Sequence, residues 1–532
     1  MSIYVNQVGY YPKMTKHATV TRPGKYTIKG QNDDEFLTVS IDKASFGYDA
    51  NSGDEVAVLD FSSLQETGTY YITSDMGDES CRFAIKDQVY DNLLRDSMRM
   101  FYFQRCGCQL EKKYAGEYEH GPCHMGPMSL LRDRSKSLDC RGGWHDAGDF
   151  GKYVTAGAVA LAHLLYGYEL VPEAFRENLN IPESGNGIDD ILNECRYELE
   201  WILTMQNEEG GVYHKCTSIR HQDFRMPEDD DLPFFCTPVS SMAVADFVGI
   251  CYLAARVYKE ADRVFADRLA KAADLSWQWL MANPDFLYDN DPSCTTGEYD
   301  DVSDLDERMW ASAERYRATK DQEALDYLKK QLVYRIDTTS LGWADVGGFA
   351  ALCVFGAPKD CFDSDVVSRF EADWSDEASR ILAVSRSNHY ELGMRPHEFI
   401  WGSNMEVLKY AAVLLIEGRR KGDEAYIEAG RYQLDYILGR NALDISYVTG
   451  YGEHAFKNPH NRPTHCDGVD LPIPGYVAGG PDGHPCDEEA MKLIREGTPA
   501  MKCYVDNVWC YSLNEITIYW NSIFVMALAL AR

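Results

Sequence analysis

Positive charge is scarce in this chain. Its 532 residues include 52 Lys and Arg against 84 Asp and Glu, which gives a formal net charge of -32 at pH 7. A surface of that sign repels nucleic acid and anionic membranes, and it favours a neutral or cationic substrate. We therefore expect neither a nucleic acid nor a membrane as a partner.

Two kinds of hydrophobic segment are also missing. The first residues, Met1 to Asn6, show no basic stretch followed by an apolar run, so no secretion signal is expected. No run of about 20 apolar residues occurs, which argues against a membrane span. The 16 cysteines, without such a signal, indicate a reducing compartment in which thiols stay free or bind metal. We predict a cytoplasmic protein, or a secreted one if a signal peptide has been removed.

The length predicts two domains, one of them large. Residues 1–86 contain short runs of β-branched and aromatic residues separated by turn signals. These predicted strands are 3–5, 17–21, 25–29, 35–41, 55–61, 69–73 and 81–85. About seven short strands in so little chain predict an immunoglobulin-like β-sandwich. We expect this domain to be structural and docked on its neighbour.

From residue 87 to 532 the hydrophobic period becomes helical. The predicted helices are 88–102, 153–170, 187–205, 241–258, 261–281, 304–319, 321–335, 375–385, 404–417, 423–438 and 514–529, with one more between Trp343 and Val354. About a dozen helices with long loops fit a barrel of helix pairs. The loops 207–238, 283–303 and 440–505 are long enough to carry function.

One glycine-rich stretch stands immediately before a long helical pattern. Residues 142–153 read Gly-Gly-Trp-His-Asp-Ala-Gly-Asp-Phe-Gly-Lys-Tyr, which places Asp146 and Asp149 three positions apart. Glycine lets the backbone turn tightly and come close to a ligand. The two carboxylates could then point at a common spot, such as a water that needs a base. The alternative is an ordinary helix N-terminus, where Asp and Gly are capping residues.

This stretch resembles the signature of glycoside hydrolase family 9, the inverting cellulase-type enzymes. The resemblance implies an (α/α)6 barrel for residues 87–532, behind the immunoglobulin-like module that many members carry. It also implies that Asp149 is the general base and that Asp146 helps to hold the water.

A second segment extends the resemblance near the C-terminus. Residues 458–463, Asn-Pro-His-Asn-Arg-Pro, look like the family's loop in which a His and an Arg bind the sugar beside the scissile bond. His460 and Arg462 match that pair, with Asn461 where a second His is common. Alone, an exposed His and Arg would more often be ordinary surface residues.

A third segment supplies a candidate acid. Asn514-Glu515, ahead of an apolar helix, looks like the family's general-acid segment. Aromatic surroundings would disfavour the charged form of Glu515 and raise its pKa, so that it can hold a proton. The alternative is a capping Glu at a helix start. We expect Trp401 and Tyr511 to contribute to substrate binding.

Cysteines and histidines gather just before the glycine-rich stretch. Cys106, Cys123, His124 and His145 give the Cys2His2 set that a structural zinc needs. The pattern also looks like the zinc site of some family 9 enzymes, where the last His directly precedes the catalytic Asp. A zinc there would tie three loop segments together.

The same region allows alternative ligands and an alternative without metal. Three nearby residues, Cys108, His120 and Cys140, could replace a member of the set, and the simplest alternative is buried thiols with solvent-exposed histidines. No HExxH motif occurs, and four ligands leave no open position for water, so a zinc-dependent hydrolase is disfavoured.

A weaker metal signal lies in residues 296–307, Thr-Gly-Glu-Tyr-Asp-Asp-Val-Ser-Asp-Leu-Asp-Glu. Clustered carboxylates suit calcium. Similar acidic loops bind calcium in family 9, with an Asp-Glu pair opening the next helix, so Asp304, Asp306 and Glu307 are the predicted ligands. The alternative is an acidic helix start favoured by the helix dipole.

Taken together, these features predict an inverting glycoside hydrolase that cleaves β-1,4-glucosidic bonds in soluble β-glucans or cellodextrins, as an endoglucanase or a cellodextrinase. The acidic chain leaves open an exo-β-glucosaminidase acting on chitosan oligosaccharides. A non-catalytic sugar-binding protein is the alternative of another class, but it has no reason to keep both Asp149 and Glu515. We expect a monomer.

Overall fold

The N-terminal part of the chain is a β-sandwich in the computed structural model, which describes residues 3–532. Residues 1 and 2, which belong to the expected first domain, lie outside the described residues. One sheet has the order β1-β3-β7-β6 and the other β2-β9-β8-β4-β5. Their facing sides enclose a core of their own, which includes Tyr26, Ile28 and Phe83. The elements are β1 (Ile3–Tyr4), β2 (Gly9–Tyr10), β3 (His17–Val20), β4 (Gly24–Gly30), β5 (Glu35–Ile41), η1 (Lys43–Ser45), β6 (Gly47–Tyr48), β7 (Glu55–Asp60), β8 (Gly68–Ser74) and β9 (Phe83–Ile85).

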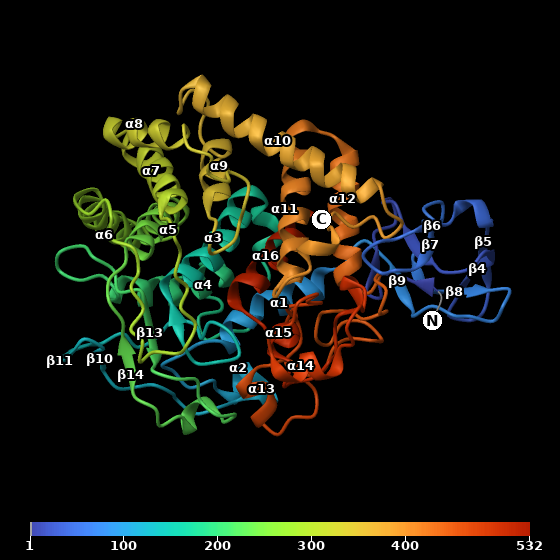
Figure 1. The fold of residues 1–532 in the computed structure, drawn as a ribbon, viewed down its shortest axis with the longest axis horizontal. Coiled ribbons are helices and arrows are strands. Elements are labelled where there is room, and N and C mark those ends of the chain that lie inside the picture. The colour runs from blue at the N-terminus through green and yellow to red at the C-terminus, as the bar shows by residue number, and fades with distance from the viewer. Residues whose placement is uncertain (1–2) are drawn as a thin grey trace.

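The rest of the described chain is an (α/α)6 barrel, drawn from blue (α1) to red (α16) in Figure 1. Its inner helices are α3 (Val154–Leu170), α5 (Ser241–Tyr258), α7 (Leu305–Thr319), α9 (Gly347–Phe355), α11 (Ser403–Lys421) and α16 (Ile518–Leu530). Its outer helices are α1 (Asp91–Phe103), α4 (Asp190–Thr204), α6 (Arg263–Ala282), α8 (Gln322–Gln331), α10 (Ser364–Arg386) and α12 (Glu424–Ile437). Within the ring, α3 packs between α16 and α5, and α5 packs against α7.

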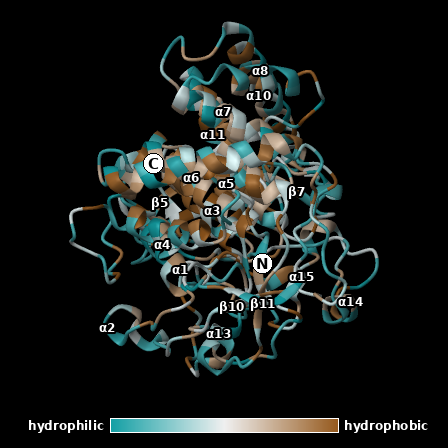
Figure 2. Ribbon diagram, turned by 90° about the vertical axis from the view of Figure 1, so that its left-hand side faces the viewer, coloured by the Kyte–Doolittle hydropathy of each residue, from teal (hydrophilic) through white to brown (hydrophobic). Residues whose placement is uncertain are grey.

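Side-chain polarity explains which helices lie inside. All residues of α16 are buried, and α3 and α5 are brown with apolar residues at the centre of Figure 2. An outer helix such as α8 buries only one stripe, which includes Ala324, Leu325 and Leu328. Helix α5 is, by length and composition alone, long and apolar enough to cross a membrane, but 83% of it is buried inside the protein.

The sequence did not predict a small sheet beside the barrel. Its strands are β10 (Met128–Leu130), β11 (Asp133–Leu138), β12 (Lys152–Tyr153), β13 (Lys215–Ser218) and β14 (Phe234–Cys236), in the order β11-β10-β14-β13-β12. Strands this short give no clear alternation of apolar and polar residues. Four short helices and five 3-10 turns complete the fold: α2 (Lys112–Ala115), η2 (Gly116–Tyr118), η3 (Pro172–Phe175), η4 (Pro227–Asp229), η5 (Pro396–Glu398), α13 (Arg462–Cys466), α14 (Glu488–Leu493), η6 (Ala500–Lys502) and α15 (Tyr511–Asn514).

Four predicted helix boundaries were wrong by four residues or more. Helix α8 ends at Gln331 rather than at residue 335, and α11 continues to Lys421 rather than ending at residue 417. Helix α10 begins at Ser364 rather than at residue 375, because its first turns carry a buried stripe with Val366 and Phe370. The last helix was predicted from Asn514 but begins at Ile518, because Glu515 takes an extended conformation with ψ of 150° and ends α15.

The sandwich docks on the barrel through buried polar contacts. Asn6 Nδ2 donates a hydrogen bond to Asp435 Oδ1 on α12 at 2.8 Å. Glu391 accepts from Arg440 Nη1 at 2.8 Å and lies 2.8 Å from His17 Nδ1 of β3. The sandwich therefore sits beside α12, at one end of the long axis in Figure 1.

Candidate active site

The glycine-rich loop holds Asp146 and Asp149 against the C-terminal part of the chain. The Asp146 carbonyl accepts from Ile518 N–H at 2.8 Å, which ties the loop to the start of α16. The Gly148 carbonyl accepts from Arg462 N–H at 3.1 Å and from Arg462 Nη1 at 2.8 Å. A Cβ on Gly148 would lie 1.8 Å from the His460 carbonyl oxygen, so only glycine allows the two backbones to approach this closely.

Glu515 lies in the break between α15 and α16. The Thr517 hydroxyl caps α16 by accepting from Trp520 N–H at 3.1 Å. The Glu515 carbonyl accepts from Gly479 N–H at 2.9 Å, and His460 N–H donates to the Asn514 carbonyl at 2.8 Å. The structure thus brings the glycine-rich loop, the His-Arg loop and the predicted acid segment into one hydrogen-bonded group.

A cavity of about 490 Å³ opens between these segments. Asp146, Asp149 and Glu515 all line it, together with Trp401, whose ring is 45% exposed. Trp343, Tyr519 and Trp520 supply further aromatic surface. Aromatic faces beside a few convergent polar groups are typical of a site for a neutral polar ligand such as a sugar.

The surroundings raise the pKa of Glu515 and of Asp146, and they lower the pKa of Asp149. Burial raises the pKa of Glu515 well above its usual value, and the charges of Asp149 and Asp146 raise it further. Burial would also raise the pKa of Asp149, but the hydrogen bond from His221 and the charges of His221 and Arg462 outweigh it, so that the pKa of Asp149 lies below its usual value. Burial and the charge of Asp149 raise the pKa of Asp146. These opposite shifts favour the protonated form of Glu515 and the ionised form of Asp149.

Two side chains that sequence reasoning missed contact the carboxylates. Tyr299 donates from its hydroxyl to Asp146 Oδ2 at 2.5 Å, and His221 Nδ1 lies 3.4 Å from Asp149 Oδ2. Both come from long loops that were predicted to be functional, 283–303 and 207–238. Tyr299 also stands within the acidic stretch predicted to bind calcium, and its φ of 50° is unusual for a non-glycine residue. The sequence offered no signal that would pair either residue with a carboxylate.

The remaining predicted sugar-binding residues lie around the cavity rather than along its described lining. The Arg462 guanidinium is 6% exposed and donates to the backbone carbonyls of Gln222 and Gly148, so it fixes the loops to one another. His460 Nδ1 donates to the Val508 carbonyl at 2.6 Å. The centroid of the Tyr511 ring lies 5.4 Å from that of Trp401, which lines the cavity, and 5.9 Å from that of His460.

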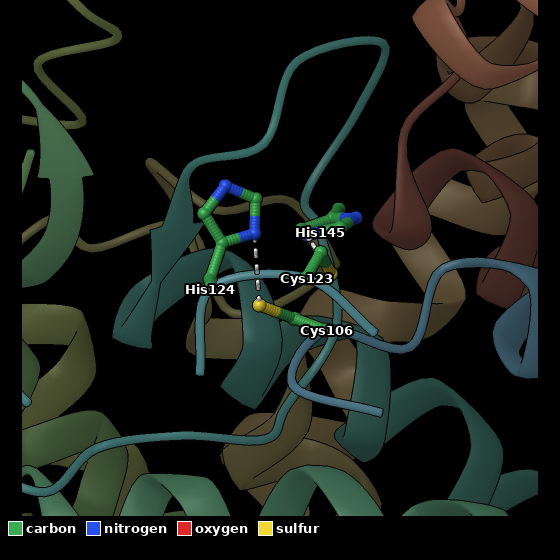
Figure 3. A group of neighbouring side chains, drawn as sticks. All are labelled: Cys106, Cys123, His124 and His145. Atoms are coloured by element: carbon green, nitrogen blue, oxygen red, sulfur yellow. Dashed lines mark hydrogen bonds between the residues drawn. The ribbon is translucent and has the colours of Figure 1, made fainter. Parts of the chain in front are cut away.

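The four predicted zinc ligands converge from three loop segments (Figure 3). Their ligand atoms lie within 4.8 Å of one another, with Cys106 Sγ 3.7 Å from His124 Nδ1 and Cys123 Sγ 4.0 Å from His145 Nε2. Metal–ligand bonds of about 2.0–2.3 Å fit such a set with small adjustments. His124 Nε2 also lies 3.1 Å from Asp230 Oδ2, an orienting carboxylate of the kind found behind metal-bound histidines. The nearby Cys108, His120 and Cys140 are outside this set.

The predicted calcium ligands differ in how well they fit a cation. Asp304 is committed to an ion pair with Arg308 at 2.9 Å, and Asp306 Oδ2 accepts from Val346 N–H at 2.7 Å. Glu307 on α7 is buried, and neither of its carboxylate oxygens has a hydrogen-bond partner among the described residues. The same is true of Asp246 on α5, which the sequence did not indicate. Burial, Asp306 and Asp246 raise the pKa of Glu307. Two such orphaned carboxyl groups fit a bound cation better than Asp304 does.

Comparison with known proteins agrees with this architecture over almost the whole chain. The profile "Glycosyl hydrolase family 9" matches residues 90–528, and "Cellulase N-terminal ig-like domain" matches residues 1–79. A cellodextrinase from Butyrivibrio fibrisolvens is 42% identical over 547 aligned residues, which cover 99% of both chains. Endoglucanase D from Acetivibrio thermocellus is 32% identical, over 99% of this chain and 83% of that protein. A mutant thermostable endoglucanase from Alicyclobacillus acidocaldarius has a similar structure, with a TM-score of 0.92, 33% identity and 99% coverage of both chains.

Proposed function

The chain belongs to glycosyl hydrolase family 9, and we propose on that basis that it cleaves β-1,4-glucosidic bonds in cellodextrins and soluble β-glucans with inversion at the anomeric carbon. It is a glycoside hydrolase with cellodextrinase and endoglucanase relatives. The observation that carries the mechanism is the opposite direction of the Asp149 and Glu515 pKa values in one cavity. A glycoside hydrolase needs such a pair, one group ionised and one protonated, and the resemblance to family 9 is what supports inversion rather than retention.

Each carboxyl group then has a separate task. The Glu515 carboxyl gives its proton to the glycosidic oxygen as the bond to the anomeric carbon breaks. Asp149 takes a proton from a water that attacks the same carbon from the opposite face. Asp146, fixed by the Tyr299 hydroxyl, helps to orient that water. The reaction consumes one water molecule for each bond cleaved. Proton exchange with solvent then returns Glu515 to its protonated form and Asp149 to its ionised form.

Trp401 and the His460–Arg462 segment are the proposed substrate-binding residues. The exposed Trp401 ring at the cavity is suited to pack on a sugar face. His460, Arg462 and Tyr511 remain proposed binding residues, with Arg462 also positioning the base loop through the Gly148 carbonyl.

Metal ions would stabilise the structure of this site without taking part in the reaction. The fit of Cys106, Cys123, His124 and His145 supports a structural zinc that cross-links the loops beside Asp146. Glu307 and Asp246, with Asp306 nearby, support a calcium ion between α5 and α7. Each ion would supply only cross-linking and charge neutralisation. Sixteen cysteines that stay free or bind metal would suit a reducing, cytoplasmic location.

An exo-β-glucosaminidase is the second candidate, because three more carboxylates, those of Glu298, Asp345 and Glu406, line the same cavity. Such a lining would attract the ammonium groups of chitosan oligomers.

The test is product analysis on cellopentaose and chitosan pentamer, with anomeric NMR of the fresh products. We expect cellopentaose to be cut to α-anomers, and the product lengths distinguish endo from exo action. Cleavage of chitosan pentamer but not of cellopentaose would show that the substrate is an aminosugar oligomer. β-anomeric first products would overturn the inverting mechanism.

Two variants test the assigned roles. Glu515→Gln and Asp149→Asn should each lower kcat by roughly 10²–10⁴-fold, because each removes one proton-transfer group. The matched control is Asp139→Asn, whose carboxylate is on the surface and, within residues 3–532, pairs only with Arg141. Circular dichroism should show the same fold in all three. Near-normal turnover in either site variant would refute its role.

A further inference from the structure

Three cysteines outside the predicted zinc set meet in the interior. Cys140 comes from the loop after β11, Cys216 from β13 and Cys236 from β14. The Cys140 sulfur lies 3.3 Å from that of Cys236 and 3.7 Å from that of Cys216, and all three sulfurs lie within 4.8 Å of one another. None of the three residues is more than 1% exposed.

The register of the small sheet brings these cysteines close together. Cys216 and Cys236 are direct partners across the antiparallel β13–β14 pair, so their side chains lie on the same face. Lys152 is the partner of Cys216 on the other neighbour, β12. The third cysteine, Cys140, is held to this face because Lys152 Nζ donates to its carbonyl at 2.9 Å.

Lys152 gives the cluster an unusual electrostatic setting. The residue is fully buried, and its ammonium donates to the carbonyls of Cys140 and Gly142 at 2.9 and 2.7 Å. Among residues 3–532 no carboxylate forms an ion pair with it. A buried ammonium is stabilised by nearby negative charge, and thiolates bound to a metal would provide it.

We propose that Cys140, Cys216 and Cys236 form a second metal site, a three-sulfur site for one thiophilic ion of the Cu(I) type. Thiolate ligands select soft ions such as Cu(I). Three bonds of about 2.3 Å in a plane place the sulfurs about 4.0 Å apart, close to the observed spacing. No further Cys, His, Asp or Glu of the described chain joins the group, whereas structural zinc takes four ligands.

The position gives this site a consequence for the active site. Strand β12 begins at Lys152, just after Phe150 and Gly151, which follow Asp149, and it is paired to β13 through Lys152 and Cys216. A metal held by Cys140, Cys216 and Cys236 would therefore cross-link the sheet that follows the base loop. The predicted zinc would fix the same loop from its other end, at His145.

Anaerobic titration of the full-length, zinc-loaded protein with Cu(I), in competition with a Cu(I) chelator, tests the proposal. We expect uptake of one Cu(I), three sulfur neighbours by X-ray absorption, and unchanged zinc content by mass spectrometry. Cys216→Ser and Cys236→Ser should lose that uptake. Cys251→Ser is the matched control, because Cys251 is an equally buried thiol on α5 outside any such group.

If Cys216→Ser or Cys236→Ser fails to fold, a third variant still tests the proposal. Cys140→Ser changes a loop residue rather than a strand residue, and it should also lose Cu(I) binding. A rise in the melting temperature of the wild-type protein with Cu(I), absent in Cys140→Ser, provides a second readout.

Three results would overturn the proposal. In the first, Cu(I) uptake equals zinc release, so that the ion has entered the Cys106 site. In the second, Cys140→Ser and Cys216→Ser bind Cu(I) as the wild type does. In the third, the wild type isolated under reducing conditions takes up no Cu(I) and instead contains a Cys140–Cys236 disulfide in its peptide map.

Discussion

At the scale of single residues, the site depends on side chains that tune the carboxyl groups without belonging to any motif. His221 comes from the loop before β14, and its imidazole reaches Asp149 at 3.4 Å. The hydrogen bond and charge that it contributes help to lower the pKa of Asp149. The ionisation of the proposed base therefore depends on a residue 72 positions away in the sequence.

Replacement of His221 should shift the pH profile in one direction. In His221→Ala, Asp149 loses one of the groups that lower its pKa, so its pKa rises, although Arg462 and the Gly151 N–H still act on it. The base must be ionised, so the acidic limb of kcat/KM should move to higher pH. The alkaline limb, where Glu515 loses its proton, should stay in place. Measured pH profiles on an aryl cellobioside, with the exposed His484→Ala as control, check this. An unmoved acidic limb would contradict the assigned effect of His221.

Sequence patterns predicted only those residues of this site that are marked by their neighbours in the sequence. Asp146 and Asp149 stand out because glycines surround them, and Glu515 because it precedes an apolar helix. Tyr299 and His221 meet the carboxylates only through the folding of two long loops. No periodicity specifies where such loops end in space, so their roles required the structure.

At the scale of elements, three loops are held so closely that one added methyl group should disturb them. In Gly148→Ala the new Cβ would clash with the His460 carbonyl oxygen, 1.8 Å away. Relief of the clash should cost about 1–3 kcal/mol of unfolding free energy and separate the base loop from the His-Arg loop. We expect lower urea stability and a fall in kcat.

The control for this change is Gly126→Ala. An added Cβ there meets no atom within 4 Å, and its backbone is not in the left-handed region. Its stability and activity should match the wild type. Equal activity of Gly148→Ala and Gly126→Ala would show that the close loop contact is unnecessary for catalysis.

The predicted zinc should stabilise these loops without entering the reaction. Removal by a chelator should lower the melting temperature, by the equivalent of about 4 kcal/mol if zinc is present at a thousand times its Kd. Activity should disappear only as the fold loosens. Calorimetry and rate measurements on the same samples check this order, and His145→Ala should make the protein insensitive to chelator. Immediate loss of activity in the intact fold would instead indicate a catalytic metal.

Elements with long apolar periods were predictable, whereas short ones were not. The buried helices α5 and α16 have apolar residues over most of their length, so the sequence shows them clearly. Strands β12 and β14 have two and three residues and exist because neighbouring strands pair with them. Tertiary pairing of this kind leaves no local pattern.

At the scale of the whole molecule, the two domains share a polar interface. Arg440, with no exposed surface, donates to Glu391, which also contacts His17 of the sandwich. Cys81 of the sandwich is buried beside His454 and Asp444 of the barrel, with its sulfur 3.4 Å from His454 Nδ1. The order of the domains followed from the change of hydrophobic period near residue 87. The contacts that cross from one domain to the other join residues more than 360 positions apart, and no sequence pattern predicted them.

Loss of the central carboxylate should loosen this interface. Glu391→Gln removes the carboxylate that lies 2.8 Å from His17 of the sandwich, which weakens the contact between the domains. It also leaves the buried Arg440 of the barrel without its charged partner, which should cost about 3–5 kcal/mol. All 10 tryptophans lie in the barrel, so their fluorescence in urea follows barrel unfolding. Cys81 is the sandwich's one cysteine, and its rate of alkylation, read by peptide mass spectrometry, follows undocking. We expect faster Cys81 labelling at urea concentrations where the tryptophan signal is still native. The exposed Glu488→Gln is the control. If labelling of Cys81 and the tryptophan transition stay coincident in Glu391→Gln, the two domains unfold as one unit and this contact is not what holds them together.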